Sequence, residues 1–188
     1  VATEVAQHPA VQASLLRPDL HRVEVFEFVS RIARDQQVGV EVYDNRAHLI
    51  AWEGSSEPPH SKEIQIALAG QLASFVTRSQ VFSQLFVVTP VRSDGKILGA
   101  VLVRRTTELN YPLNNRLIVS TGITERLTRE LGVQVEFNYS PNASLRKDGR
   151  YLSTSLIGID SSKVGVVSVV RPSKGSYLEL RKAPTWRV

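Results

Sequence analysis

Residues able to perform catalysis are few and widely spaced. The chain has no cysteine, which removes thiolate nucleophiles, disulfides and thiolate zinc sites. No Gly-x-Ser-x-Gly turn presents a serine nucleophile, and no Gly-x-Gly-x-x-Gly or phosphate-binding loop is present. The four histidines are scattered: His8, His21, His48 and His60. This pattern indicates a domain that is not an enzyme and needs no cofactor.

A metal site is the next candidate. His48 and His60 could supply two nitrogen ligands, and Glu53 or Glu57 could supply a third. The spacing of these residues matches no zinc pattern, so we expect surface histidines and no bound metal.

Ligand binding fits the residue types better than catalysis does. Tyr43 and Trp52 could form an aromatic wall, although ordinary core packing would account for both equally well. Arg78 offers paired donors that match a carboxylate or another small anion. The alternative interpretation is that Arg78 is an exposed strand residue with no binding role. The predicted polar anchors are His60, Thr77, Arg78 and Gln80.

The elements that must position these residues begin with helices. Ala2 to Leu16 has helical composition, and Pro9 should interrupt it. An amphipathic helix is predicted from Asp19 to Gln37, with Asp19 as its cap after Pro18. Its apolar stripe is Leu20, Val23, Phe26, Val29, Ile32 and Ala33.

Strands follow in hairpins. Val38 to Tyr43 alternates in hydropathy, and Asp44-Asn45-Arg46 is a turn before a strand over His48 to Trp52. A helix is predicted from His60 or Ser61 to about Ala73. A short strand over Phe75 to Ser79 and a long hairpin follow. The hairpin joins Phe82–Val91 to Lys96–Arg105 through the Ser93-Asp94-Gly95 turn.

The second half repeats parts of the first. Residues 31–42 return as residues 126–137, each reading as a helix that runs into a strand. Residues 94–105 are echoed by residues 161–172, each a turn and a strand. A helix is predicted from Pro112 to Gly132, and strands over Val133–Tyr139, Tyr151–Ile159, Lys163–Arg171 and Tyr177–Leu180. The repeat predicts two α+β modules, at 1–110 and 111–188, the second without the middle helix. The alternative is chance likeness between amphipathic segments.

Charge is distributed unevenly. The net charge is +5, and residues 107–188 hold 12 basic and 7 acidic side chains, against 11 of each before them. Such a skew could serve nucleic acid or anionic lipid, but no dense basic run occurs and aromatic residues are few. A solvated basic face explains it equally well, and nucleic acid is not an expected partner.

The order of elements resembles the Cache family, the PAS-like extracytoplasmic sensor domains of bacterial receptors. The segment Val40-Glu-Val-Tyr-Asp-Asn-Arg-Ala-His-Leu-Ile-Ala-Trp is similar to the first hairpin of that family. The segment Thr89-Pro-Val-Arg-Ser-Asp-Gly-Lys-Ile-Leu-Gly-Ala-Val is similar to its last. The arginine and tryptophan-tyrosine pattern of amino-acid-binding double Cache domains has no clear match, so an amino acid is not the favoured ligand.

The resemblance implies an extracytoplasmic (periplasmic) sensor domain of a membrane receptor, foremost a two-component histidine kinase. It implies a small-molecule site in the first module, anchoring by flanking segments outside this sequence, and a homodimer paired through the helix Asp19–Gln37. The alternative is a cytoplasmic PAS-like regulatory module that binds a protein partner or nucleic acid. No membrane span and no leader are apparent in the sequence itself.

Overall fold

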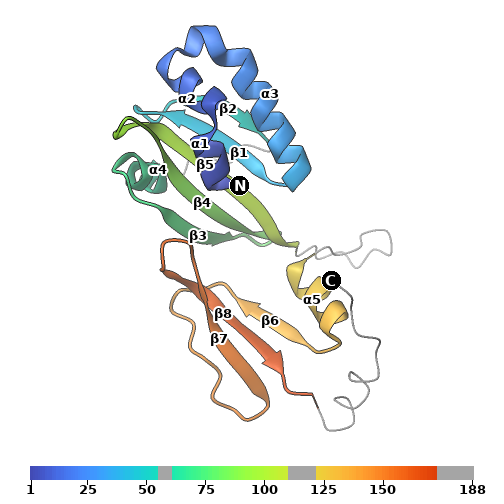
Figure 1. The fold of residues 1–188 in the computed structure, drawn as a ribbon. Helices are drawn as coiled ribbons and strands as arrows, with labels where there is room; N and C mark the ends of the chain where they lie inside the picture. Colours follow the sequence, from blue (N-terminus) through green and yellow to red (C-terminus); the bar gives the residue numbers. More distant parts are fainter. Residues whose placement is uncertain (55–60, 110–121, 173–188) are drawn as a thin grey trace.

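The computed structural model describes residues 1–54, 61–109 and 122–172, which form two sheets with flanking helices (Figure 1). The first module contains α1 (Ala2–Gln7), α2 (Pro9–Leu16), α3 (Pro18–Gln36) and α4 (Ser61–Leu68). Its strands are β1 (Gly39–Asp44), β2 (Leu49–Glu53), β3 (Ala73–Arg78), β4 (Phe82–Ser93) and β5 (Lys96–Leu109). The second contains α5 (Ile123–Leu131), β6 (Val135–Asn138), β7 (Tyr151–Ile157) and β8 (Lys163–Val170).

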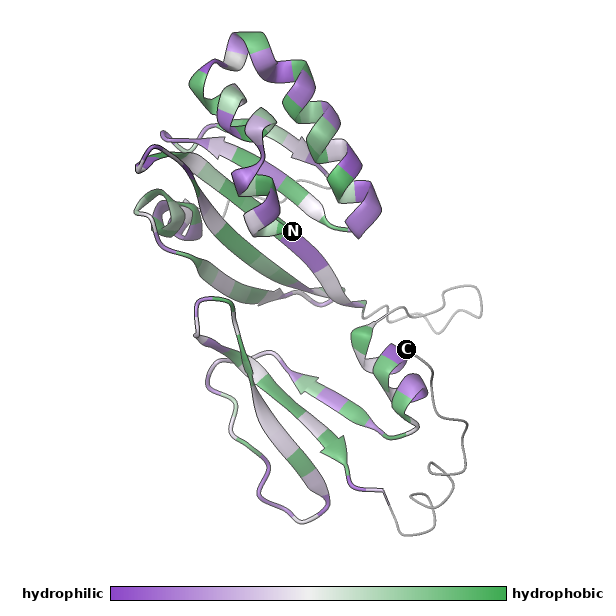
Figure 2. Cartoon of the chain, viewed as in Figure 1, coloured by the Kyte–Doolittle hydropathy of each residue, from purple (hydrophilic) through white to green (hydrophobic). Residues whose placement is uncertain are grey.

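The first sheet is antiparallel with strand order β2-β1-β5-β4-β3, and helices cover both of its faces. Alternation along β1 separates the two faces, since successive side chains of a strand point to opposite sides. Val40 and Val42 pack with α1 to α3, whereas Tyr43 packs with Ile64 and Ala67 of α4. Apolar residues follow β4 and β5 along much of their length, and polar residues gather on the outer side of α3 (Figure 2).

The helices depart from the predicted phase in one place. Val25, Val29 and Ile32 of α3 are buried as an amphipathic helix requires, but Leu20 and Val23 are each 70% exposed. His21 has non-helical backbone angles (φ −116°, ψ 16°) that kink the helix. Leu20 precedes the kink, and Val23 lies about 200° around the helix from the buried Val25, so the prediction that Leu20 and Val23 face the core is wrong.

The helix boundaries follow local backbone chemistry. Pro18 occupies the first position of α3 and Arg17 is its N-cap, so the cap predicted at Asp19 is wrong. The predicted break at Pro9 is confirmed, because α1 ends at Gln7 and α2 starts at Pro9. At the next helix, α4 ends at Leu68 rather than near Ala73. Gly70 follows it with φ +88°, a conformation that glycine adopts without strain.

The predicted hairpins β1–β2 and β4–β5 are confirmed. The turn between β4 and β5 has Asp94 and Gly95 at positive φ (49° and 75°), the geometry that a tight two-residue hairpin requires. At the turn between β1 and β2, Asp44 Oδ1 accepts hydrogen bonds from the backbone N–H groups of Arg46 and His48, both at 2.8 Å.

The second sheet has strand order β6-β8-β7, which reproduces the β1-β5-β4 core of the first. Each central strand carries a glycine where its neighbour passes closely. An added Cβ would collide with the carbonyl oxygen of Tyr43 at Gly99, and with that of Asn138 at Gly165. The same device at matching positions supports the internal repeat. Two predictions fall outside the described residues: the strand Tyr177–Leu180 and the beginning of the helix from Pro112. The module boundary at 110/111 also lies there and stays a prediction.

Candidate functional site

Polar side chains interrupt the apolar α4 face of the first sheet at the end nearer the second module. Cross-strand register brings them into rows, because residues directly opposite each other share a face. Arg104 of β5 lies opposite Gly39 of β1 and Phe86 of β4. In the next row Gln84 lies between Thr106 and Thr77. The face therefore runs from an apolar half under α4 to a polar half at this end.

A buried ion pair is the centre of the polar half. Arg104 Nη1 donates to Glu41 Oε1 at 3.0 Å, and both side chains are 5% exposed. The Tyr43 hydroxyl donates to the other carboxylate oxygen, Oε2, at 2.5 Å. Burial raises the pKa of Tyr43 above its ordinary value, and the hydrogen bond to the Glu41 carboxylate raises it further. Tyr43 is thus held as a neutral donor that fixes the carboxylate opposite Arg104.

Glycine makes room for the guanidinium group. A Cβ at Gly39 would lie 2.5 Å from Arg104 Nε and 2.8 Å from Cγ. The missing side chain lets Arg104 lie flat across β1, with Gly54 on its far side. An arginine side chain is thereby buried against the backbone of the sheet, where its charge must be paired and hydrogen-bonded.

Two polar atoms at this end are left without partners. Arg104 Nη2 and Gln84 Oε1 are buried and make no hydrogen bond to any residue that the structure describes, although Gln84 Nε2 lies 3.4 Å from Thr106 Oγ1. An unpaired buried donor or acceptor costs roughly 1–3 kcal/mol, and more when it is charged. Such atoms at a cavity wall indicate that a partner group belongs there.

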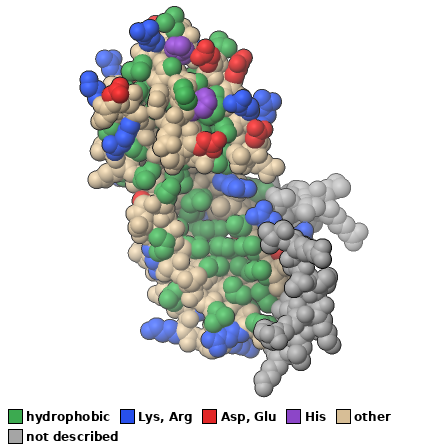
Figure 3. All heavy atoms as spheres, in the orientation of Figure 1, with side chains coloured by type: hydrophobic (Ala, Val, Ile, Leu, Met, Phe, Trp, Pro, Cys, Tyr) green, Lys and Arg blue, Asp and Glu red, His purple; other side chains and the backbone are tan. Residues whose placement is uncertain are grey.

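A cavity of about 1120 Å³ opens beside these atoms. Its walls come from the end of α3, the adjoining ends of β1, β2, β4 and β5, and α5 of the second module. Basic side chains gather on the surface where the modules meet (Figure 3). The ionisable residues among its described walls are Arg34, Glu53, Arg104, Arg105, Arg126 and Arg129.

The structure distributes the sequence-predicted site residues differently. Tyr43 and Thr77 lie on the α4 face, and Tyr43 is in the core cluster as well as in the Arg104 network. Trp52 is 44% exposed on β2, and its ring meets Phe26 edge-on at 5.5 Å.

The remaining predicted residues lie elsewhere. Arg78 and Gln80 are exposed at the end of β3 and in the loop after it. Neither is among the described residues that line the cavity. His60 lies outside the described residues.

Sequence reasoning missed Glu41, Gln84 and Arg104. The alternation of the first strand assigned no role to Glu41, whereas the structure buries it to 3% exposure as a whole residue. A signal did exist. Glu41 and Arg104 are opposite charges inside two strands of strongly apolar character, and a buried charge requires a partner. Only the pairing of β1 with β5 identifies which residue that partner is.

Within the described ranges, no group of three or more histidine, aspartate or glutamate residues could hold a metal ion. The described helices also include none that is long and apolar enough to cross a membrane.

Comparison with known proteins identifies the fold. No family model and no curated protein matches the sequence. The structure is similar to the sensor domain of the V. cholerae histidine kinase DctB, with a TM-score of 0.53 at 10% identity, over 92% of this chain and 88% of that one. It is also similar to the extracellular domain of the candidate histidine kinase vpHK1S-Z8. The TM-score is 0.51 at 12% identity, over 98% of this chain and 85% of that one. The chain therefore has the double Cache-like α+β fold predicted by the resemblance.

Proposed function

We propose that this chain is the extracytoplasmic sensor domain of a bacterial transmembrane receptor, foremost a histidine kinase, and that it binds a small anion at Arg104. The observation that carries the proposal is the buried Nη2 of Arg104, which has no hydrogen-bond partner among the described residues and belongs to a cavity-lining residue. The fold shared with the DctB sensor domain supports a sensing role. In this role the domain recognises a ligand and performs no chemistry on it.

The roles of the residues follow from their positions. Glu41 and Tyr43 fix the guanidinium, which leaves Nη2 to donate to an anionic ligand atom. Gln84 and Thr106 provide neutral polar groups beside it. Thr77, in the same row as Gln84, extends this polar surface on β3. In this proposal Arg104 binds the anion, in place of Arg78, which was predicted from the sequence.

The proposed function includes a dimer. Leu16, Leu20 and Val23 form an exposed apolar group at the corner between α2 and α3. Leu20 and Val23 are each 70% exposed and lie away from the core of their own module. From the sequence we expect a homodimer that pairs through the helix Asp19–Gln37. We assign the paired surface to this apolar corner, which a second copy of the chain would cover.

Anion binding can be tested on the isolated domain by a thermal-shift screen against small carboxylates and inorganic phosphate. Ligand binding to the folded state raises the melting temperature by an amount that grows with the logarithm of ligand concentration over Kd. We expect at least one anion to stabilise the wild type, and Gln84→Leu to reduce that shift. Thr154→Val on the exposed side of β7 is the matched control and should leave it unchanged.

The arginine itself needs a gentler change, because removing it would leave Glu41 buried and unpaired. Arg104→Lys keeps the charge and loses the second nitrogen arm. The variant should fold, as judged by circular dichroism, and bind the anion at least tenfold more weakly. Equal anion binding by folded Arg104→Lys and the wild type would contradict the proposed site.

A further inference from the structure

The cavity beside Arg104 is strongly basic. Arg34, Arg104, Arg105, Arg126 and Arg129 line it, against the single acidic residue Glu53 among its described walls. The buried carboxylate of Glu41 pairs with Arg104. The other arginines that line the cavity have no buried counter-ion among the described residues. Clefts lined by one sign of charge concentrate ions of the opposite sign.

The arginines come from both modules. Arg104 and Arg105 lie in the second half of the long strand β5 of the first module, whereas Arg126 and Arg129 lie on α5 of the second. Residues three apart on a helix are neighbours on one face, so Arg126 and Arg129 line the cavity together. The wall of the cavity is therefore incomplete in either module alone.

These arginines are available to a ligand. Arg126 Nε lies 4.0 Å from Glu130 Oε1, and both side chains are more than half exposed, so this pair is weak. The side chains of Arg105 and Arg129 make no ion pair or hydrogen bond with the part of the chain that the structure describes.

The position of α5 is fixed by contacts at the junction. Glu108, near the end of β5, accepts hydrogen bonds from the backbone N–H of Thr124 (3.2 Å) and from its hydroxyl (2.5 Å). A second contact joins the modules through Ser74 Oγ and Asp160 Oδ1 at 2.5 Å. Arg126 follows Thr124 by two residues, so the Glu108 contact keeps the α5 arginines beside the cavity.

We infer that the cavity takes a small anion with at least two negatively charged groups, and that this ligand bridges the two modules. One group binds Arg104 of the first module, and another binds Arg126 and Arg129 of the second. The inference rests on the proposed function and adds to it the class of ligand and the participation of α5. Binding then favours the arrangement in which α5 lies against the end of β5, because only that arrangement supplies both sets of donors.

The test is isothermal titration calorimetry of the domain with acetate, succinate, citrate and inorganic pyrophosphate at constant ionic strength. We expect a multivalent anion to bind at least tenfold more tightly than acetate. The double variant Arg126→Gln/Arg129→Gln should weaken that anion at least tenfold, which corresponds to about 1.4 kcal/mol. The control Arg22→Gln/Arg46→Gln removes the same charge from exposed positions of α3 and the β1–β2 turn, and should change affinity less than twofold.

Hydrogen exchange gives an independent measurement of bridging. Amides of residues 123–131 should exchange more slowly in the wild type when the tightest anion is bound, and this protection should be lost in the double variant. If Gln84→Leu weakened anion binding but Arg126→Gln/Arg129→Gln left the affinity unchanged, the bridging inference would be overturned while the proposed function stayed intact. Failure of every anion to bind the wild type would overturn both.

Discussion

Arg104 Nη1 lies 3.0 Å from Glu41 Oε1 in a pair whose side chains are each 5% exposed, and Nη2 of the same guanidinium has no partner within residues 1–54, 61–109 and 122–172. The pair joins adjacent strands β1 and β5 at the place where the core gives way to the cavity. Burial of two charges is costly unless both are well bonded, so a pair with a free donor is poorly explained by stability alone. A ligand group completing the bonds would explain its arrangement.

The first prediction concerns the cost of breaking this pair. Arg104→Met alone leaves Glu41 charged and unpaired, and should lower the free energy of unfolding by about 3–5 kcal/mol. Combining it with Glu41→Gln removes the charge and keeps an acceptor for the Tyr43 hydroxyl, so most of the loss should be recovered. Urea denaturation of the wild type, both single variants and the double variant measures this coupling. Additive effects of the two substitutions would contradict a mutually dependent pair.

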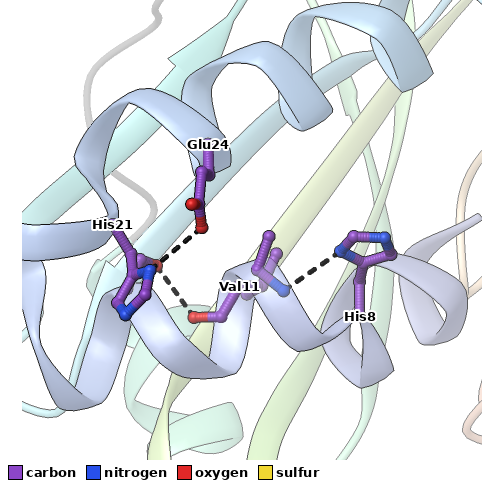
Figure 4. Close-up of polar contacts among 6 residues, drawn as sticks. His8, Val11, His21 and Glu24 are labelled. Carbon is purple, nitrogen blue, oxygen red and sulfur yellow. Dashed lines mark hydrogen bonds and ion pairs between the residues drawn. The ribbon is translucent and has the colours of Figure 1, made fainter.

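The second prediction concerns acid stability at His8. Its ring stacks on Phe28 at 3.6 Å between centroids, and its Nδ1 accepts a hydrogen bond from the backbone N–H of Ala10 at 3.2 Å, which caps α2 (Figure 4). Burial lowers the pKa of His8 from 6.5, the positive charge of Arg31 lowers it further, and Glu4 partly opposes both.

Because the folded-state pKa is depressed, the unfolded chain binds the proton more readily. The contribution of neutral His8 to stability is therefore present above pH 6.5 and lost as the pH falls below it. Melting temperatures between pH 7.5 and pH 5 should fall more steeply for the wild type than for His8→Asn, which keeps a capping side chain that does not titrate. Parallel curves for the two proteins would be inconsistent with this role.

The third prediction concerns the contact between the modules. An added Cβ at Gly158 would collide with Ser74 Oγ, the group that bonds Asp160. Gly158→Ala should therefore destabilise the chain by about 1–3 kcal/mol, the usual range for overpacking. Ser74→Ala removes the obstructing oxygen, so the same change should cost less in that background. A double-mutant cycle by urea denaturation provides the test, and a coupling energy near zero would show that the two residues do not touch in solution.

The fourth prediction concerns self-association. Leu20→Ser/Val23→Ser removes the exposed apolar group at the α2–α3 corner without touching the core, so folding should be unchanged. Sedimentation velocity at increasing concentration should detect a dimer of the wild type and less of it in the variant. Leu152→Ser, at an exposed apolar position of β7, is the control. If the wild type stayed monomeric at millimolar concentration, this surface would lose its proposed role.

Sequence alone predicted the fold where local rules decide it. Alternation identified β1, the Asp94-Gly95 pair identified a hairpin turn, and the repeat identified β5 and β8 as matching strands, which the structure places at the centre of their sheets. Each feature depends on neighbours in sequence or on a period, both visible in the chain.

The candidate site was not predicted, because it depends on pairing across 63 residues. Glu41 resembles any outward residue of an alternating strand until β5 places Arg104 beside it. Similarly, the exposure of Leu20 and Val23 follows from the phase of α3, whose buried side includes Val25 and Phe28, two residues outside the predicted stripe. Arg78 seemed a suitable anion-binding residue because nothing in its own segment indicates where β3 ends relative to the cavity.

A crystal structure of the domain with the tightest-binding anion tests the central claim most directly. The account predicts an anionic group of the ligand within about 3 Å of Arg104 Nη2, the distance of a charge-assisted hydrogen bond. The Glu41–Arg104 pair and the Tyr43 hydroxyl bond should be unchanged beneath it. A ligand bound elsewhere, with Arg104 Nη2 still unpaired, would contradict the assignment of this cavity as the sensing site.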